Sequence, residues 1–184
     1  MTELNEFTII KGTSKRIVDY WKWAYSNINM NSERGVFAEF LIGSALDSLG
    51  TGRVEWDVAD IKYRGNLIEV KSSAFLQEWE QKKPSIPIFD IAKKYEFGEY
   101  TSSRVRHAHI YIFALLYEED RNFMDPLDME QWEFYILSTR RINEFFGDQK
   151  SVSLNPLKKV CNPVRYKDIN SVVDEIIDIQ NKSD

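Results

Sequence analysis

One apolar run constrains the fold of this chain more than any other feature. From Ala108 to Tyr117 the sequence reads AHIYIFALLY, in which apolar side chains are almost continuous. The run is too short to cross a bilayer as a helix. It is typical of a strand that is buried on both faces of its sheet. The sequence therefore predicts a mixed sheet with helices packed on it.

The residues around this run predict an α+β order with a mixed sheet. Ser14 to Asn27 has an apolar helical side, and Gly50-Thr51-Gly52 stops a second helix that begins at Asn31 or Ser32. Arg64-Gly65 is the expected turn between two strands. The expected helices are 14–27, 31–49, 74–83, 139–146 and 168–179, the expected strands are 54–63, 66–73, 109–117 and 132–137, and 84–103 is expected to be irregular.

Size and composition favour one globular domain over residues 1–184. The chain has 43% hydrophobic residues and no linker that would split it. We expect a core over about 32–137 and a helical and β extension over 138–184. The formal charge of −5 argues against a protein that coats nucleic acid nonspecifically. With no secretory signal, no membrane-spanning run and Cys161 as the single cysteine, a cytoplasmic protein without a zinc cluster is expected.

A candidate site begins in the strand LIEVKSS. Successive strand side chains alternate between faces, so Glu69 and Lys71 are expected on one side and Ile68 and Val70 on the other, in a core. A carboxylate beside an ammonium on a rigid strand can bind a divalent ion and assist a nearby water. Phosphodiester hydrolysis needs both functions.

The preceding strand supplies two further carboxylates, Asp57 and Asp60. If Arg64-Gly65 forms a two-residue turn, Asp60 lies opposite Glu69 and shares its face. A three-residue turn would put Asp57 on that face instead, because the parity of the strand changes. The register count favours Asp60, and Asp57 is kept as an alternative or as a second contributor.

A third acidic side chain comes from the helix upstream. In VFAEFLIGSAL, from Val36 to Leu46, Glu39 and Ser44 are the only polar residues. A glutamate inside such an apolar stretch is expected to be partly buried, and a buried charge is costly without a partner. A metal ion or Lys71 would provide that partner.

These residues together resemble the PD-(D/E)XK nuclease superfamily, the restriction-endonuclease-like fold. The stretches RGVFAEFLIGSAL, RVEWDVADI, IEVKSSAFLQEW and DPLDMEQWEFYIL are also similar to a group of uncharacterised bacterial proteins with that fold. The resemblance implies an αβββαβ core with helices on both faces and Mg²⁺-dependent DNA cleavage, with Mn²⁺ as a substitute. The chain departs from the first half of the motif, because a tryptophan and an alanine, not proline, precede the two aspartates.

The resemblance also implies a role for each site residue. The implied metal ligands are Glu39, Glu69 and either Asp57 or Asp60, and Lys71 is the implied catalytic residue. Two further residues would support the site. Ser73 is the second of the two serines that follow Lys71, and Gln77 is at a position where some members of the superfamily carry a glutamine.

A basic segment is the candidate nucleic-acid contact. Between Lys82 and Arg106 six basic residues face three acidic ones, a local charge of +3. Such a segment can hold a phosphate backbone, and a solvated loop explains it equally well. The six candidates are Lys82, Lys83, Lys93, Lys94, Arg104 and Arg106.

The sequence thus predicts a metal-dependent nuclease acting in defence, repair or mobile-element processing. DNA is the expected partner, while RNA and a homodimer stay open and no membrane is expected. Two alternatives remain. One is a binding module on the same fold that holds nucleic acid or protein without cleavage, and the other is an assembly component that uses exposed aromatic residues as a protein interface.

Overall fold

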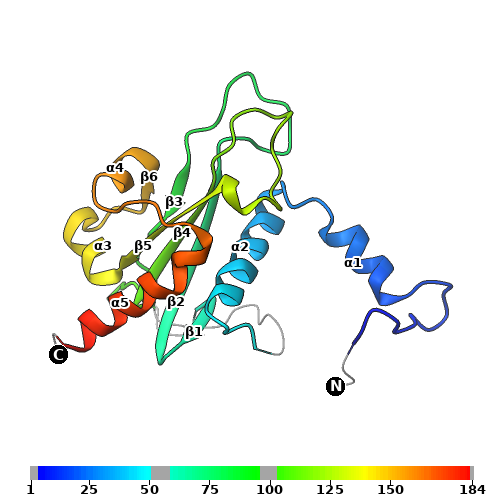
Figure 1. The fold of residues 1–184 in the computed structure, drawn as a ribbon, viewed down its shortest axis with the longest axis horizontal. Helices are drawn as coiled ribbons and strands as arrows, with labels where there is room; N and C mark the ends of the chain where they lie inside the picture. The colour runs from blue at the N-terminus through cyan, green and yellow to red at the C-terminus, as the bar shows by residue number, and fades with distance from the viewer. Residues whose placement is uncertain (1–3, 51–58, 96–102, 183–184) are drawn as a thin grey trace.

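The computed structural model describes residues 4–50, 59–95 and 103–182. Within them the chain folds into a mixed α/β arrangement (Figure 1). The elements are α1 (Ile17–Tyr25), α2 (Asn31–Ala45), β1 (Ile61–Tyr63), β2 (Asn66–Ala74), β3 (Ile88–Asp90), β4 (Ile110–Leu116), β5 (Trp132–Ser138), α3 (Thr139–Phe146), β6 (Ser151–Ser153), α4 (Leu154–Lys158) and α5 (Ile169–Asn181), with short 3₁₀ turns at Met129–Gln131 and Tyr166–Asp168.

The described strands form two sheets. The larger has the order β1-β2-β4-β5, and the smaller pairs β3 with β6. β1 and β2 form an antiparallel hairpin, β2 and β4 run parallel, and β4 and β5 run antiparallel. The predicted class, a mixed sheet with helices, is confirmed.

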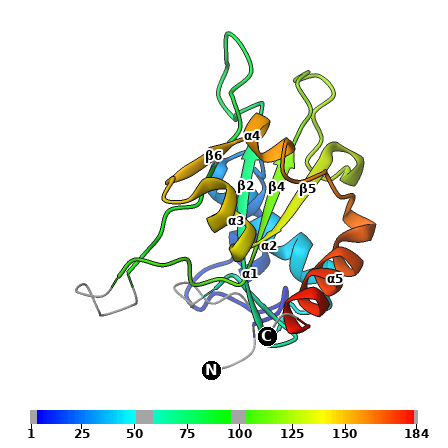
Figure 2. The ribbon, with the colours of Figure 1, turned by 90° about the vertical axis from the view of Figure 1, so that its left-hand side faces the viewer.

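β4 forms the centre of the core, and all seven of its residues are buried. On one face of the sheet its even-numbered side chains join Ile42 of α2 and Val173 of α5 in one apolar cluster. On the other face its odd-numbered side chains join Ile142 of α3 and Val152 of β6. Figure 2 shows α3 and β6 on one side of the strands and α5 on the other. The apolar run therefore behaves as its composition predicts, with helices on both faces.

The β1-β2 turn sets the register on which the site depends. Tyr63 faces Asn66 and Lys62 faces Leu67, so Arg64 and Gly65 are the two central residues, as predicted. Both have positive φ, 47° and 76°, as a tight hairpin turn requires. The Arg64 guanidinium holds the turn against α5 through ion pairs with Asp174 at 2.5 Å and Asp178 at 3.1 Å.

The helix predicted over 74–83 is wrong. β2 continues through Ala74, and a loop follows in which side chains take over backbone hydrogen bonds. Gln81 accepts from the Gln77 N–H at 2.6 Å and donates to Ser85 Oγ at 2.9 Å. Such local bonds compete with a helix. In the described residues no α-helix lies between β2 and β4, so the position that the αβββαβ order gives to its second helix is not filled.

Other differences concern short elements. The strand predicted over 54–63 is formed at Ile61–Tyr63, Ala59 and Asp60 lie in a bend, and 54–58 lie outside the described residues. The segment predicted to be irregular contains β3, and β6 and α4 lie in the expected helical and β extension, for which no bounds of these two elements were predicted. α1 has no buried residue and lies apart from the sheet in Figure 1. Among the described residues, no helix combines the length and apolarity that a membrane span requires.

Candidate functional site

Glu69 and Lys71 lie side by side on β2, as the alternation of strand side chains predicts. Lys71 Nζ lies 2.5 Å from Glu69 Oε1, and the side chains are 22% and 14% exposed. Between them Val70 turns to the opposite face and packs in the core with Ile68. The pair is thus held by a strand whose other face is fixed in the core, and it is too enclosed to be an ordinary surface ion pair.

A second lysine reaches the same carboxylate. Lys94 Nζ lies 3.2 Å from Glu69 Oε1. The Lys94 backbone is anchored to Val105 by reciprocal hydrogen bonds of 2.8 and 3.0 Å, which brings the side chain back toward β2. Burial alone would raise the pKa of Glu69, but Lys71 and Lys94 outweigh this effect and lower it. Glu69 is therefore held as an anion between two cations.

Asp60 lies one residue before β1 and is hydrogen-bonded to β2. Ile61 pairs with Ile68, so the next position along β1 lies opposite Glu69. β1 begins only at Ile61, and the carboxylate of the preceding Asp60 accepts a hydrogen bond from the Val70 N–H at 2.7 Å. The side chain thus takes up a hydrogen bond that a longer β1 would have satisfied, and this fixes the carboxylate beside the Glu69 strand.

The charge of Asp60 is unfavourable in this position. Asp60 as a residue is exposed, but protein atoms crowd its carboxyl group, and this loss of hydration is the largest influence that raises its pKa to about 6. The Val70 hydrogen bond and Lys71 oppose the rise, while Glu69 and Glu39 add to it through repulsion. A carboxyl group that is costly to ionise and sits among other acids suits a cation site.

Glu39 joins this neighbourhood from α2. It is half-buried, as its apolar surroundings predict, and its charge acts on Asp60. The charge of Asp60, just before β1, is therefore influenced by two carboxylates, Glu69 of β2 and Glu39 of α2, and by the ammonium of Lys71. Asp57, the alternative to Asp60, lies outside the described residues.

The carboxylates around Glu69 can be compared with the ligands that Mg²⁺ prefers. Carboxylate oxygens are the ligands that a hard cation prefers, and Asp60, Glu69 and Glu39 carry three negative charges against the two of Lys71 and Lys94. Over residues 4–50, 59–95 and 103–182, however, no three His, Cys, Asp or Glu side chains are close enough together to hold a metal ion. The chemistry of the donors fits Mg²⁺, while a ready-made three-ligand cage is absent from this described part.

Tyr111 is a site residue that sequence reasoning missed. It is the partner of Glu69 in the parallel β2-β4 pair and is 4% exposed. Burial, followed by the charge of Glu69, raises the pKa of the Tyr111 phenol well above its usual range. The phenol therefore stays neutral, and the charge of Glu69 acts on it. The parallel register reveals it, and no local pattern in the apolar run could have done so.

The predicted supporting residues have different positions. Gln77 is buried and donates from Nε2 to the Ala74 carbonyl at 3.1 Å, so it stabilises the loop after β2. The backbone carbonyl of Gln77 accepts a hydrogen bond from Arg121 Nη2 at 2.8 Å. Ser73 is half-buried on β2 opposite Leu115, two residues beyond Lys71. Ser73 thus belongs to the strand that carries the site, whereas Gln77 shapes the loop beyond it.

The six basic residues do not form one surface. Lys82 and Lys83 are exposed, while Lys93 pairs with Asp148 at 2.6 Å and Lys94 pairs with Glu69. The Arg104 guanidinium stacks on the Tyr95 ring at 4.4 Å. Arg106 is 7% exposed and bonded to backbone carbonyls, so its guanidinium is directed into the protein. Of the six, Lys94 is the one that reaches the carboxylates.

The raised pKa of Asp60 predicts a stabilising substitution. The pKa of Asp60 is about 6 in the folded state and 3.8 for the free group. Between pH 3.8 and about pH 6 the folded protein therefore binds more protons at this residue than the unfolded chain does. The free energy of unfolding consequently falls as pH rises through this window. Asp60→Asn keeps an acceptor for Val70 and removes the charge. We expect it to raise the free energy of unfolding at pH 7.5 by about 1 kcal/mol, a value reduced because water screens a partly exposed carboxyl group.

Urea unfolding in EDTA at pH 7.5 and pH 4 measures this effect, and the gain should shrink at the lower pH. Asp148→Asn is the control with the opposite sign, because Lys93 lowers the pKa of Asp148. A loss of stability in Asp60→Asn at pH 7.5 would contradict the electrostatic account of this residue.

No protein-family model and no curated protein sequence matches this chain. The resemblance to the PD-(D/E)XK superfamily therefore stays a prediction from the motif residues, and the function is argued from the geometry around Glu69.

Proposed function

We propose that this protein is a metal-dependent nuclease that hydrolyses phosphodiester bonds in DNA, with its active site at Glu69, Lys71, Asp60 and Glu39. One observation carries the proposal. A carboxylate on a rigid strand is held by two lysines, and acidic groups from two other segments act on the same place. Clustered carboxylates beside an ammonium are typical of sites that transfer or hydrolyse phosphate esters.

Each residue has a distinct part in this reaction. Asp60 and Glu69, with Glu39, would hold Mg²⁺, which when bound neutralises phosphate charge and makes water more acidic. The Lys71 ammonium, next to Glu69, donates hydrogen bonds to a phosphate oxygen or to the attacking water. Lys94 brings a second positive charge to the same carboxylate and can bind the substrate's phosphate. The buried Tyr111 hydroxyl adds a neutral donor.

We also propose that the protein acts in the cytoplasm. The chain has one cysteine, Cys161, which is half-buried and free. A protein that needs no disulfide fits the cytoplasm, where its nucleic-acid substrate is found.

Cleavage assays with a matched pair of variants test the proposal. Wild-type protein should cleave plasmid or linear DNA with Mg²⁺ or Mn²⁺ and not with EDTA, and RNA under the same conditions measures the preference between substrates. Glu69→Gln should abolish cleavage and weaken Mn²⁺ binding in calorimetry about tenfold or more. Glu144→Gln, an exposed change of equal charge on α3, should behave as wild type. Equal cleavage by Glu69→Gln and wild type would rule out this active site.

A binding module is the second candidate. It is favoured by the absence, within the described segments, of a three-ligand metal group. In that case DNA would be retained by the wild-type protein in gel-shift experiments and would stay intact under every metal condition.

A further inference from the structure

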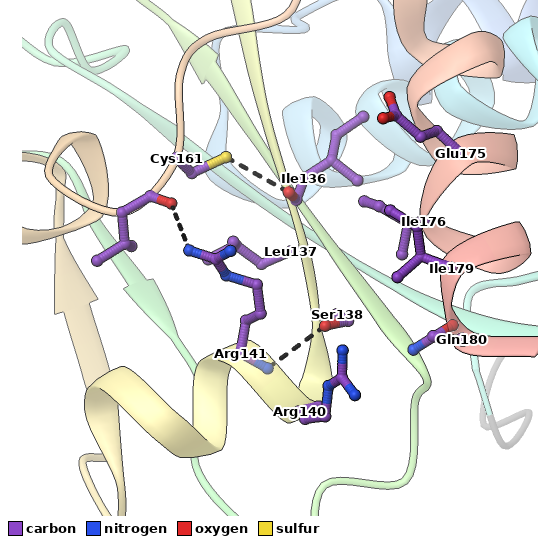
Figure 3. Close-up of a pocket in the computed structure, with 11 residues that line it drawn as sticks. Ile136, Leu137, Ser138, Arg140, Arg141, Cys161, Glu175, Ile176, Ile179 and Gln180 are labelled. Carbon is purple, nitrogen blue, oxygen red and sulfur yellow. Dashed lines mark hydrogen bonds between the residues drawn. The ribbon is translucent and has the colours of Figure 1, made fainter. Parts of the chain in front are cut away.

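A cavity of about 310 Å³ lies at the edge of the sheet, on the strand farthest from β1 (Figure 3). β5 forms its floor, the start of α3 and one side of α5 border it, and Cys161 closes it on the remaining side. Because β4 separates β5 from β2, this cavity is distinct from the site at Glu69. Nothing in the proposed hydrolysis uses it.

The floor of the cavity is an open strand edge. Phe134 exchanges backbone hydrogen bonds with Val164 on this edge, at 3.0 and 2.7 Å. Alternate residues of an antiparallel strand direct their backbone groups to the same side, so the N–H groups of Ile136 and Ser138 also face outward. The Ile136 carbonyl accepts a weak bond from Cys161 Sγ at 3.4 Å. The strand edge therefore offers peptide N–H donors to a ligand.

Two arginines border the same cavity. Arg141 is positioned by the Phe145 ring at 5.0 Å and the Val160 carbonyl at 3.4 Å. The Arg140 guanidinium makes no hydrogen bond or ion pair with any residue that the structure describes, and it lies between Ser138 and Gln180 in Figure 3. The Arg141 guanidinium points the other way, toward Val160, so the Arg140 guanidinium beside the outward N–H of Ser138 is the group that suits a phosphate or a carboxylate.

The opposite wall has different chemistry. Ile176 and Ile179 of α5 line it together with Ile136 of the floor. Glu175 also borders the cavity and lies away from Arg140 in Figure 3. Its negative charge disfavours an extended polyanion such as a nucleic-acid strand, and the volume corresponds to the lower end of small-molecule sites. The cavity thus combines a cationic end with an apolar wall.

We propose that this cavity binds a small organic anion, whose phosphate or carboxylate group contacts Arg140 and whose apolar body packs on Ile136, Ile176 and Ile179. The inference goes beyond the nuclease function and does not depend on it. Loss of DNA cleavage by Glu69→Gln leaves this site intact, and loss of anion binding leaves cleavage unchanged.

The single cysteine of the chain provides a direct test. Cys161 lines the cavity, so a bound ligand should slow its alkylation by iodoacetamide. Phenyl phosphate is the probe, and we expect saturable protection that reduces the alkylation rate about tenfold when binding is complete. Inorganic phosphate and benzyl alcohol, each matching one half of the probe, should protect only at much higher concentrations.

Arg140→Gln removes an exposed charge without removing a hydrogen bond of the described chain, so the variant should fold normally. It should require about tenfold more phenyl phosphate for equal protection. Lys22→Gln on α1, an equal charge change far from the cavity, should match wild type. An unprotected Cys161, or equal protection in wild type and Arg140→Gln, would overturn the proposal.

Discussion

Lys71→Ala is expected to lower the rate of DNA cleavage about a hundredfold or more at saturating Mg²⁺. The variant removes the ammonium that lies 2.5 Å from Glu69, where it can stabilise charge that develops on the phosphate. Glu69 keeps an ion pair with Lys94 at 3.2 Å, so the carboxylate is not left unpaired and the protein should remain folded. Single-turnover plasmid nicking with protein in excess measures the loss.

Two further variants distinguish a catalytic ammonium from a merely stabilising one. Lys167→Ala removes an exposed lysine outside the site and should cleave at the wild-type rate. Lys71→Arg keeps the charge in a different shape and should recover part of the activity. A Lys71→Ala rate within about threefold of wild type would contradict this role. The Glu69→Gln result would still test the metal site on its own.

The face of β2 that carries the site was predictable because its causes are local. Strand alternation places Glu69 and Lys71 together, and Gly65, which adopts positive φ readily, marks the two-residue turn that it forms with Arg64. From this register alone, Asp60 was expected opposite Glu69. The half-buried position of Glu39 followed from its apolar neighbours in α2.

The missed features depend on long-range contacts. Lys94 reaches Glu69 because its backbone pairs with Val105, and Tyr111 joins the site through the parallel pairing of β2 and β4. The helix expected after β2 does not form, because side-chain hydrogen bonds from Gln81 stabilise a loop there. β3 and β6 are three residues each and pair across a long stretch of sequence, so neither carries a periodic signal.

Arg106 illustrates how a charge count can mislead. In the sequence it belongs to a basic segment that suits a phosphate backbone, and in the fold it joins three separate stretches of chain. Nε donates to the Ile91 carbonyl at 2.7 Å, Nη1 to the Gly147 carbonyl at 3.0 Å and Nη2 to the Gln149 carbonyl at 3.1 Å. Nη1 also donates to the Asn143 side chain. These bonds tie the segment before β4 to the end of α3 and to the approach to β6.

Arg106→Ala is therefore expected to reduce the free energy of unfolding by about 3–5 kcal/mol, because a buried guanidinium is removed and three carbonyls lose their donors. In thermal unfolding this corresponds to a loss of roughly 10 °C for a chain of this size. Arg104→Ala, which removes an exposed guanidinium stacked on Tyr95, is the matched control and should cost less than about 1 kcal/mol. If Arg106→Ala instead kept wild-type stability and lost DNA affinity, the residue would be a nucleic-acid contact and its structural role would be wrong.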